Sequence, residues 1–149
     1  AFALTEAGAG SDAAGIKTRA VLKDDHYLLN GTKQWITNGG EAFVTTVLAI
    51  TDPERGMRGS SALLVDKGTE GFTAGKKENK MGIRASTTRE LIFQDAKVPK
   101  ENLLGRVGMG FMIVMKTLDQ SRPGVAAQAV GIAQGALDKA LTYAQERKQ

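Results

Sequence analysis

Residues 30–40 set the architecture of the chain, and they read Asn30-Gly31-Thr32-Lys33-Gln34-Trp35-Ile36-Thr37-Asn38-Gly39-Gly40. The segment opens on Asn-Gly, the residue pair that favours a type I′ hairpin turn. It closes on a second turn signal and holds the only tryptophan between β-branched residues. The pattern predicts a hairpin turn at Asn30-Gly31, with strands over 27–30 and 33–37 on either side.

Further turn signals follow at short intervals on both sides of this segment. They are Asp24-Asp25, Asp52-Pro53-Glu54-Arg55-Gly56 and Lys67-Gly68-Thr69-Glu70-Gly71. The runs between them have strand character, over residues 18–23, 43–50, 61–66, 72–76 and 89–94. Many short strands without intervening helices predict that residues 1–105 form a mainly β domain, a sandwich or a barrel.

The pattern changes to helical spacing after Met109, with Phe111, Val114, Met115 and Leu118 as the first apolar positions. Apolar positions at this spacing continue to Ala144, so we expect a long α-helix. Pro123 removes one backbone hydrogen bond, and this predicts a kink or a restart with Ser121 as the new N-cap. Residues 111–115 are apolar on every side, and such a helix requires burial against other helices.

The composition sets the outer limits of the interpretation. The chain has 149 residues, a net charge of +4 and no cysteine. It can therefore build one real core, and it has neither disulfides nor thiolate chemistry. No apolar run approaches a membrane span. The chain begins in a strand-like segment and ends in a helix-like one, so we expect a fragment of a longer protein.

A glycine-rich loop lies near the start, in Phe2-Ala3-Leu4-Thr5-Glu6-Ala7-Gly8-Ala9-Gly10-Ser11-Asp12. Residues 8–13 fit the dinucleotide pattern G-x-G-x-x-A, but that pattern needs a helix to follow it. The strand-like residues 18–23 leave no room for one. Two interpretations stay open on this segment alone: a ligand-binding loop and a structural loop between strands.

Taken together, these two segments closely resemble the acyl-CoA dehydrogenase family. Two further blocks agree: Met81-Gly82-Ile83-Arg84-Ala85-Ser86-Thr87-Thr88 followed by Val98-Pro99-Lys100-Glu101-Asn102-Leu103-Leu104-Gly105, and Leu118-Asp119-Gln120-Ser121-Arg122 followed by Glu146-Arg147-Lys148-Gln149. The chain is most similar to the short-chain, butyryl-CoA branch. Ala7 departs from the family, which usually has proline there. The resemblance implies a middle β domain over 1–105 and the first helix of a C-terminal four-helix bundle over 106–149.

The resemblance also implies an FAD-dependent oxidation of acyl-CoA to trans-2-enoyl-CoA. Members of the family place the equivalents of Phe2, Leu4 and Thr5 at the isoalloxazine ring. Gly10 and Ser11 would lie by the pyrophosphate, with Ser11 also on the acyl-CoA path. Trp35 would pack on the flavin face away from the substrate, and Thr37 would reach towards N5. Without the resemblance, Trp35 is more simply explained as a core residue.

Residues near the C-terminal end complete the implied site. Asp119 and Arg122 would meet the CoA part of the substrate, although three-residue spacing also fits a surface ion pair. Arg147 and Gln149 would reach the FAD of a neighbouring subunit, although a basic residue there also complements the helix dipole. Ser121 occupies the position of the base in a minority of the family and cannot take up an α proton. The catalytic glutamate is therefore expected beyond Gln149, and residues 1–149 alone should be inactive.

His26 is expected in a hairpin turn without a catalytic role, and no metal site is predicted. The implied partners are an acyl-CoA substrate, electron-transfer flavoprotein and further copies in a homotetramer, in the bacterial cytoplasm or the mitochondrial matrix. Nucleic acid is not expected, because aromatic residues make up only 5% of the chain. A non-catalytic β-sandwich binding module and an acyl-CoA oxidase remain as alternatives. Acyl chain length cannot be read from the sequence.

Overall fold

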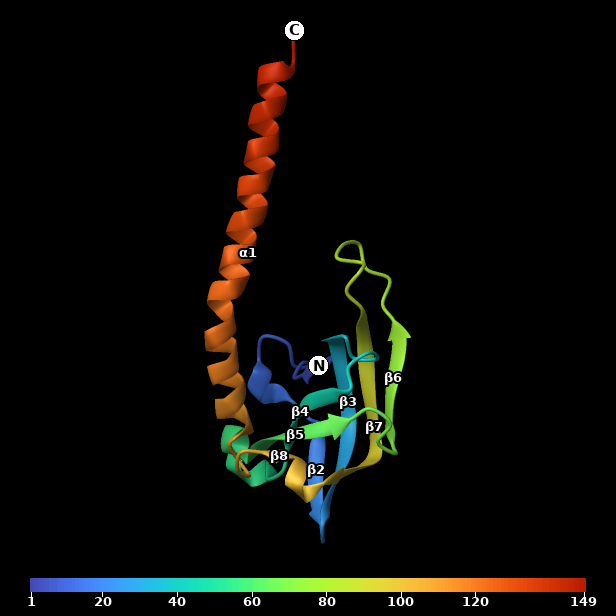
Figure 1. The fold of residues 1–149 in the computed structure, drawn as a ribbon. Helices are drawn as coiled ribbons and strands as arrows, with labels where there is room; N and C mark the ends of the chain where they lie inside the picture. Colours follow the sequence, from blue (N-terminus) through green and yellow to red (C-terminus); the bar gives the residue numbers. More distant parts are fainter. The chain divides into compact units, whose positions relative to one another are not determined.

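The computed structural model describes residues 1–149, which divide into two compact units, Ala1–Ile113 and Val114–Gln149 (Figure 1). The first unit is mainly β and the second belongs to one long helix, which confirms the fold class predicted from the sequence. The strands are β1 (Phe2–Ala3), β2 (Arg19–Lys23), β3 (His26–Thr37), β4 (Val44–Ile50), β5 (Ser60–Asp66), β6 (Phe72–Lys77), β7 (Thr88–Pro99) and β8 (Leu103–Leu104). Short 3₁₀ helices cover Ala13–Gly15, Pro53–Gly59 and Lys100–Asn102.

All eight strands join one hydrogen-bonded sheet in the order β6-β7-β3-β2-β4-β5-β8, with β1 pairing β4 in parallel. The sheet folds over a single core, because β5 contacts β7 without being its neighbour in the sheet. Alternate side chains over much of β3 and β7 are buried in this core, as the period of two requires, whereas β4 and β5 bury consecutive residues. Its fully buried members include Leu29, Leu63, Leu91 and Val98.

The hairpin turn predicted at Asn30-Gly31 is wrong, because both residues lie inside the continuous strand β3. The tight turn is Asp24-Asp25, since Lys23 pairs with His26, and His26 therefore opens β3 instead of lying in a turn. Gly31 is required for a different reason. Its φ is +143°, and a Cβ there would approach the Thr18 Oγ1 to 2.6 Å and the Thr18 Cα to 2.8 Å. The glycine thus allows β3 to pass close to the segment that precedes β2.

The long helix α1 runs from Gly110 to Glu146 without interruption, so the predicted restart at Pro123 is also wrong. Ser121 is not an N-cap, because its hydroxyl donates to the Leu118 carbonyl of the preceding turn at 2.9 Å. Proline removes one backbone hydrogen bond, and the alanine-rich sequence on its C-terminal side continues the helix. No helix in the structure combines the length and the apolar character needed to cross a membrane.

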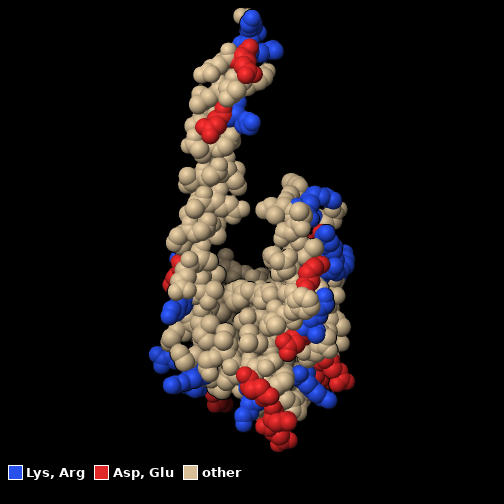
Figure 2. All heavy atoms as spheres, viewed as in Figure 1, with Lys and Arg blue, Asp and Glu red and all other residues tan.

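Charge is distributed differently over the two units, each considered by itself. Acidic and basic side chains are both present over the visible face of the β unit, whereas no charged side chain is visible along the middle of α1 (Figure 2). The sequence from Pro123 to Leu137 contains no charged residue. Val125, Val130, Ile132 and Leu137 are all more than half exposed along this stretch.

Candidate functional site

Strand β3 has an irregular backbone at Trp35. The register between β3 and β7 shifts between Lys33 and Ile36, so that three steps along β3 match two along β7. This is a β-bulge, and Trp35 sits in it with a φ of +61°. Non-glycine residues with positive φ are uncommon and strained, and they gather at functional sites.

The bulge moves the Trp35 side chain from the buried face of β3 to the exposed face. Tyr27, Leu29 and Lys33 share the buried phase of β3, and unbroken alternation would bury Trp35 as well. The extra residue buries Ile36 instead, and it leaves Trp35 59% exposed. Thr37 is exposed two residues further on, so an indole ring and a hydroxyl flank the buried Ile36 on the outer face.

The glycine-rich loop follows β1 and is closed by its own backbone. Glu6 and Ala9 exchange two backbone hydrogen bonds of 3.1 and 3.0 Å around the turn Ala7-Gly8. The Asp12 side chain then accepts from the Ala14 N–H and caps the first 3₁₀ helix. A Cβ placed on Gly8 or Gly10 would meet nothing within 4 Å, so the space beside the loop is open.

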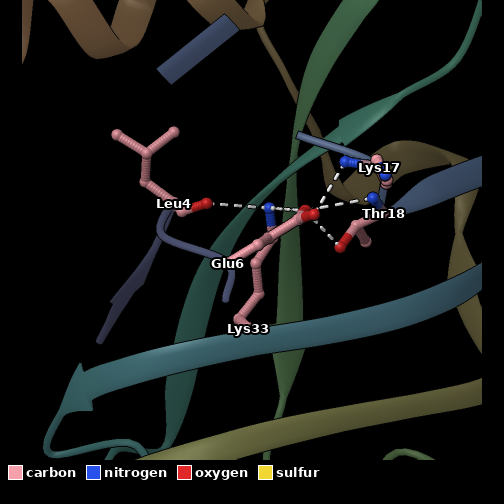
Figure 3. Close-up of polar contacts among 5 residues, drawn as sticks. All are labelled: Leu4, Glu6, Lys17, Thr18 and Lys33. Carbon is pink, nitrogen blue, oxygen red and sulfur yellow. Dashed lines mark hydrogen bonds and ion pairs between the residues drawn. The ribbon is translucent and has the colours of Figure 1, made fainter. Parts of the chain in front are cut away.

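A buried ion pair fastens this loop to β3 (Figure 3). The Lys33 side chain is fully buried, and its Nζ donates to the Glu6 Oε1 at 2.8 Å and to the Leu4 carbonyl at 3.0 Å. The same Oε1 accepts from the backbone N–H and the hydroxyl of Thr18 at 3.0 and 2.6 Å. The second carboxylate oxygen accepts from the Lys17 N–H at 2.7 Å.

Burial and pairing act in opposite senses on these two groups. Burial raises the pKa of the Glu6 carboxyl, but hydrogen bonds from Lys33, Thr18 and Lys17 outweigh it and bring this pKa below its usual 4.5. Burial lowers the pKa of the Lys33 ammonium below its usual 10.5, and the Glu6 carboxylate only partly opposes this. The surroundings therefore favour the charged form of Glu6, whereas the charged form of Lys33 is supported mainly by the Glu6 carboxylate.

The residues of the bulge, of β1 and of the glycine-rich loop include the groups that a planar, polar-edged cofactor such as a flavin requires. The hydroxyls of Thr5, Ser11 and Thr37 make no hydrogen bond within the chain and remain free to contact a ligand. Aromatic surface is exposed at Trp35 and at Phe2, which is 38% exposed. The structure also ties two of the predicted segments together, since the Gln34 N–H donates to the Thr5 carbonyl at 2.8 Å. Leu4 lies between Phe2 and Thr5, half-buried.

The remaining predicted site residues belong to the helix unit. Asp119 and Arg122 form an ion pair of 3.2 Å, with side chains 68% and 71% exposed. An apolar hollow on the same helix is lined by Leu118, Ser121, Arg122, Val125, Ala126 and Ala129. Arg147 and Gln149 follow the end of α1, and the Arg147 N–H still donates to the Tyr143 carbonyl at 2.9 Å.

Sequence reasoning missed the polar cluster of Glu6, Thr18 and Lys33. A signal for Lys33 was present, because it shares the odd-numbered phase of Tyr27 and Leu29 in β3. A lysine on a buried phase needs a carboxylate partner. The choice of Glu6 as that partner could not be read, since it depends on the closure of the loop across 27 residues.

Comparison with protein-family models gives two matches that together cover nearly the whole chain. The model described as acyl-CoA dehydrogenase, middle domain, matches residues 1–96. The model described as acyl-CoA dehydrogenase, C-terminal domain, matches residues 108–149.

Curated relatives are similar over the full chain. The short-chain specific acyl-CoA dehydrogenase of Rattus norvegicus mitochondria is 57% identical over 98% of this chain and 35% of its own length. The short-chain specific acyl-CoA dehydrogenase of Clostridium acetobutylicum is 53% identical over 100% and 39%. The acryloyl-CoA reductase (NADH) of Anaerotignum propionicum is 54% identical over 100% and 38%. The chain therefore spans well under half the length of these relatives.

Solved structures give the same result. The butyryl-CoA dehydrogenase of Megasphaera elsdenii has a TM-score of 0.95 and 55% identity, over 99% of this chain and 39% of that one. A chain from work on the electron transferring flavoprotein of Acidaminococcus fermentans has a TM-score of 0.95 and 57% identity over the same shares. An acyl-CoA dehydrogenase of Bacillus anthracis complexed with FAD has a TM-score of 0.91 and 45% identity, over 99% and 26%.

Proposed function

Because the chain belongs to the acyl-CoA dehydrogenase family, we propose that it is part of an FAD-dependent enzyme that oxidises a short- or medium-chain acyl-CoA to the trans-2-enoyl-CoA. The observation that carries the proposal is the outward turn of Trp35 at a strained bulge beside Thr37. Residues 1–105 would be the middle β domain of that enzyme, and residues 106–149 the start of its helical domain.

The β unit would supply one wall of the flavin site. FAD, when bound, supplies the acceptor for the hydride that leaves the β carbon of the substrate. Trp35 and Phe2 would cover apolar ring surface, with Leu4 beside them. The free hydroxyls of Thr5 and Thr37 would donate hydrogen bonds to polar atoms of the ring and stabilise negative charge there, because donors fixed in advance need no reorganisation.

Two further groups of residues would bind the rest of the ligands. Gly10 has open space around it and Ser11 a free hydroxyl, which suits close approach of a pyrophosphate and of the acyl-CoA chain. Asp119 and Arg122 would contact the CoA portion, and Arg147 and Gln149 the FAD of a neighbouring subunit. The proton at the α carbon would be removed by a glutamate beyond Gln149, so residues 1–149 alone should not turn over.

The relatives also support a choice of partners. We propose electron-transfer flavoprotein as the electron acceptor, in line with the similar chain from the work on the electron transferring flavoprotein of Acidaminococcus fermentans. A homotetramer would bring the proposed second-subunit contacts of Arg147 and Gln149 into place. The relatives come from bacteria and from mitochondria, and the proposed compartment is correspondingly the bacterial cytoplasm or the mitochondrial matrix.

The proposal is tested by the absorption spectrum of the purified full-length protein. A flavin band that bleaches when butyryl-CoA is added without oxygen, with formation of the enoyl-CoA, is the expected result. A series of acyl-CoA chain lengths then gives the preference that the sequence cannot supply. A full-length protein that takes up no FAD would overturn the proposal and favour the non-catalytic β-sandwich binding module.

A second candidate is the reverse reaction, reduction of a short enoyl-CoA. The 54% identity with the acryloyl-CoA reductase of Anaerotignum propionicum favours it. Consumption of NADH in the presence of acryloyl-CoA would distinguish the two directions. Production of hydrogen peroxide during acyl-CoA oxidation in air would instead identify an acyl-CoA oxidase.

A further inference from the structure

The pair of Glu6 and Lys33 connects the two segments that flank the proposed flavin wall. Lys33 donates to the Leu4 carbonyl and to the Glu6 carboxylate, while its neighbour Gln34 donates from its backbone to the Thr5 carbonyl. Three successive residues of the loop are thus held by two successive residues of β3. The next residue along β3 is Trp35, in its strained conformation.

The far side of the Glu6 carboxylate is fixed as well. Its oxygens accept from Lys17 and from Thr18, and Thr18 is wedged against Gly31 of β3. The carboxylate therefore cannot shift without breaking several hydrogen bonds at once. Figure 3 shows Lys33 bound to Leu4 and Glu6, and Thr5 is the residue between these two in the sequence. The cluster therefore restricts the position of Thr5 relative to β3, to which its carbonyl is also bonded by the Gln34 N–H.

Stability alone does not explain a buried ion pair here. Taking both charges out of water is costly, and well-packed apolar residues at such positions often give equal or greater stability. The ammonium instead holds a carbonyl in a segment that has left its strand, a task that an apolar side chain cannot perform. We infer that Glu6 and Lys33 are positioning residues that set Thr5 against Trp35, and so tune the flavin site; this rests on the proposed function.

The test uses the full-length protein with bound FAD. The double variant Glu6→Gln/Lys33→Met removes both charges together, so neither is left buried and unpaired. Glutamine keeps the length of the glutamate side chain, and methionine is one atom shorter than lysine. The control Glu70→Gln/Lys97→Met removes an exposed ion pair of 3.8 Å. A second control, Val98→Ala, perturbs the same core without touching the loop. The readouts are the flavin absorption spectrum, the FAD dissociation constant, the flavin reduction potential, and kcat and KM measured separately.

The expected result separates positioning from stability. The double variant changes the shape of the flavin spectrum and shifts the reduction potential, while both controls leave them unchanged. Its kcat falls by about tenfold to a hundredfold, since a misplacement near 1 Å can have such an effect. Its KM for acyl-CoA changes little, because neither residue is placed on the substrate. Glu6→Asp, which keeps the charge but shortens its reach, shifts the spectrum in the same direction and covers the case where the double variant does not fold.

Three results would overturn the inference. A double variant or Glu6→Asp variant with wild-type spectrum, potential and kcat would show that the pair serves stability only. If Val98→Ala changed the flavin spectrum and the reduction potential as much as the double variant does, the effect would belong to a general loosening of the core. A wild-type protein without flavin would overturn the proposed function and this inference with it. The first two results would overturn the inference and leave the proposed function standing.

Discussion

The β unit and the helix unit treat the same kinds of side chain in opposite ways. The β unit buries Leu29, Leu63 and Leu91 completely, and it also encloses the ion pair of Glu6 and Lys33. The helix leaves Leu137 and Leu141 more than half exposed, and its ion pair of Asp119 and Arg122 lies in solvent. The first unit satisfies its own groups, whereas the second carries apolar surface of the kind that packs against other helices.

The largest difference between the two units should appear when each ion pair is broken. Lys33→Met leaves the Glu6 carboxylate buried without its cation, so the free energy of unfolding should fall by about 3–5 kcal/mol. Arg122→Met removes an exposed partner and should cost less than about 1 kcal/mol. Urea unfolding of the full-length protein measures both values. Equal losses would show that burial does not distinguish the two pairs.

Apolar truncation provides the next comparison. Leu63→Ala opens a cavity in the β core and should cost about 2–5 kcal/mol. Leu137→Ala should change the stability of residues 1–149 by only a few tenths of a kcal/mol, because the side chain is exposed and alanine favours helix. In the full-length protein the same substitution should cost about 2 kcal/mol or more if other helices cover it. A small effect in both chains would mean that this face of α1 stays uncovered.

The loss of stability at acid pH should also distinguish the buried ion pair from exposed charges. The Glu6 carboxyl has a native pKa below its unfolded value of 4.5, so the stability it contributes is complete above that pH. It is lost as the pH falls through the lowered native pKa. The Glu6→Gln variant should therefore lose less stability than the wild type over the same acid range, as measured by urea midpoints between neutral pH and about pH 3.

The control for this experiment is Glu70→Gln, whose side chain is 86% exposed. This variant should keep the acid slope of the wild type. An identical slope for Glu6→Gln would contradict a lowered pKa at Glu6. The buried lysine acts in the alkaline range, because its native pKa lies below 10.5 and stability from that group rises as the pH approaches this value.

Local patterns predicted most of the fold but not its irregularities. Apolar runs between turn signals located the strands β4 and β5, and helical spacing located α1, because each signal depends on neighbours within a few residues. The Asn30-Gly31 pair gave a wrong prediction because its glycine allows a close approach to Thr18, thirteen positions earlier in the chain. The predicted N-cap at Ser121 was wrong because it assumed that Pro123 interrupts the helix, whereas α1 continues through this proline.

The candidate site shows the same division. Its residue types were evident from the resemblance to a family, but the outward turn of Trp35 depends on a bulge between β3 and β7. A bulge is fixed by the register of two strands that lie far apart in the sequence, and no local pattern encodes it. Lys33 was readable as a buried position, whereas its link to Leu4 and Glu6 required the closed loop.

The smallest expected effect on stability concerns proline. The helix has a proline in its interior, Pro123, whereas the turn Ala7-Gly8 of the β unit has none. Ala7 follows Glu6 at the first central position of that turn, its φ is negative, and its N–H makes no hydrogen bond within the chain. Proline is favoured at such a position, so Ala7→Pro should raise the free energy of unfolding by about 0.4–1 kcal/mol by restricting the unfolded chain. Ala9→Pro is the matched control, because it removes the N–H that donates to the Glu6 carbonyl at 3.0 Å and should destabilise. Urea unfolding gives the free energy of unfolding of both variants. A loss of stability in both would mean that the loop tolerates no added backbone constraint next to Glu6.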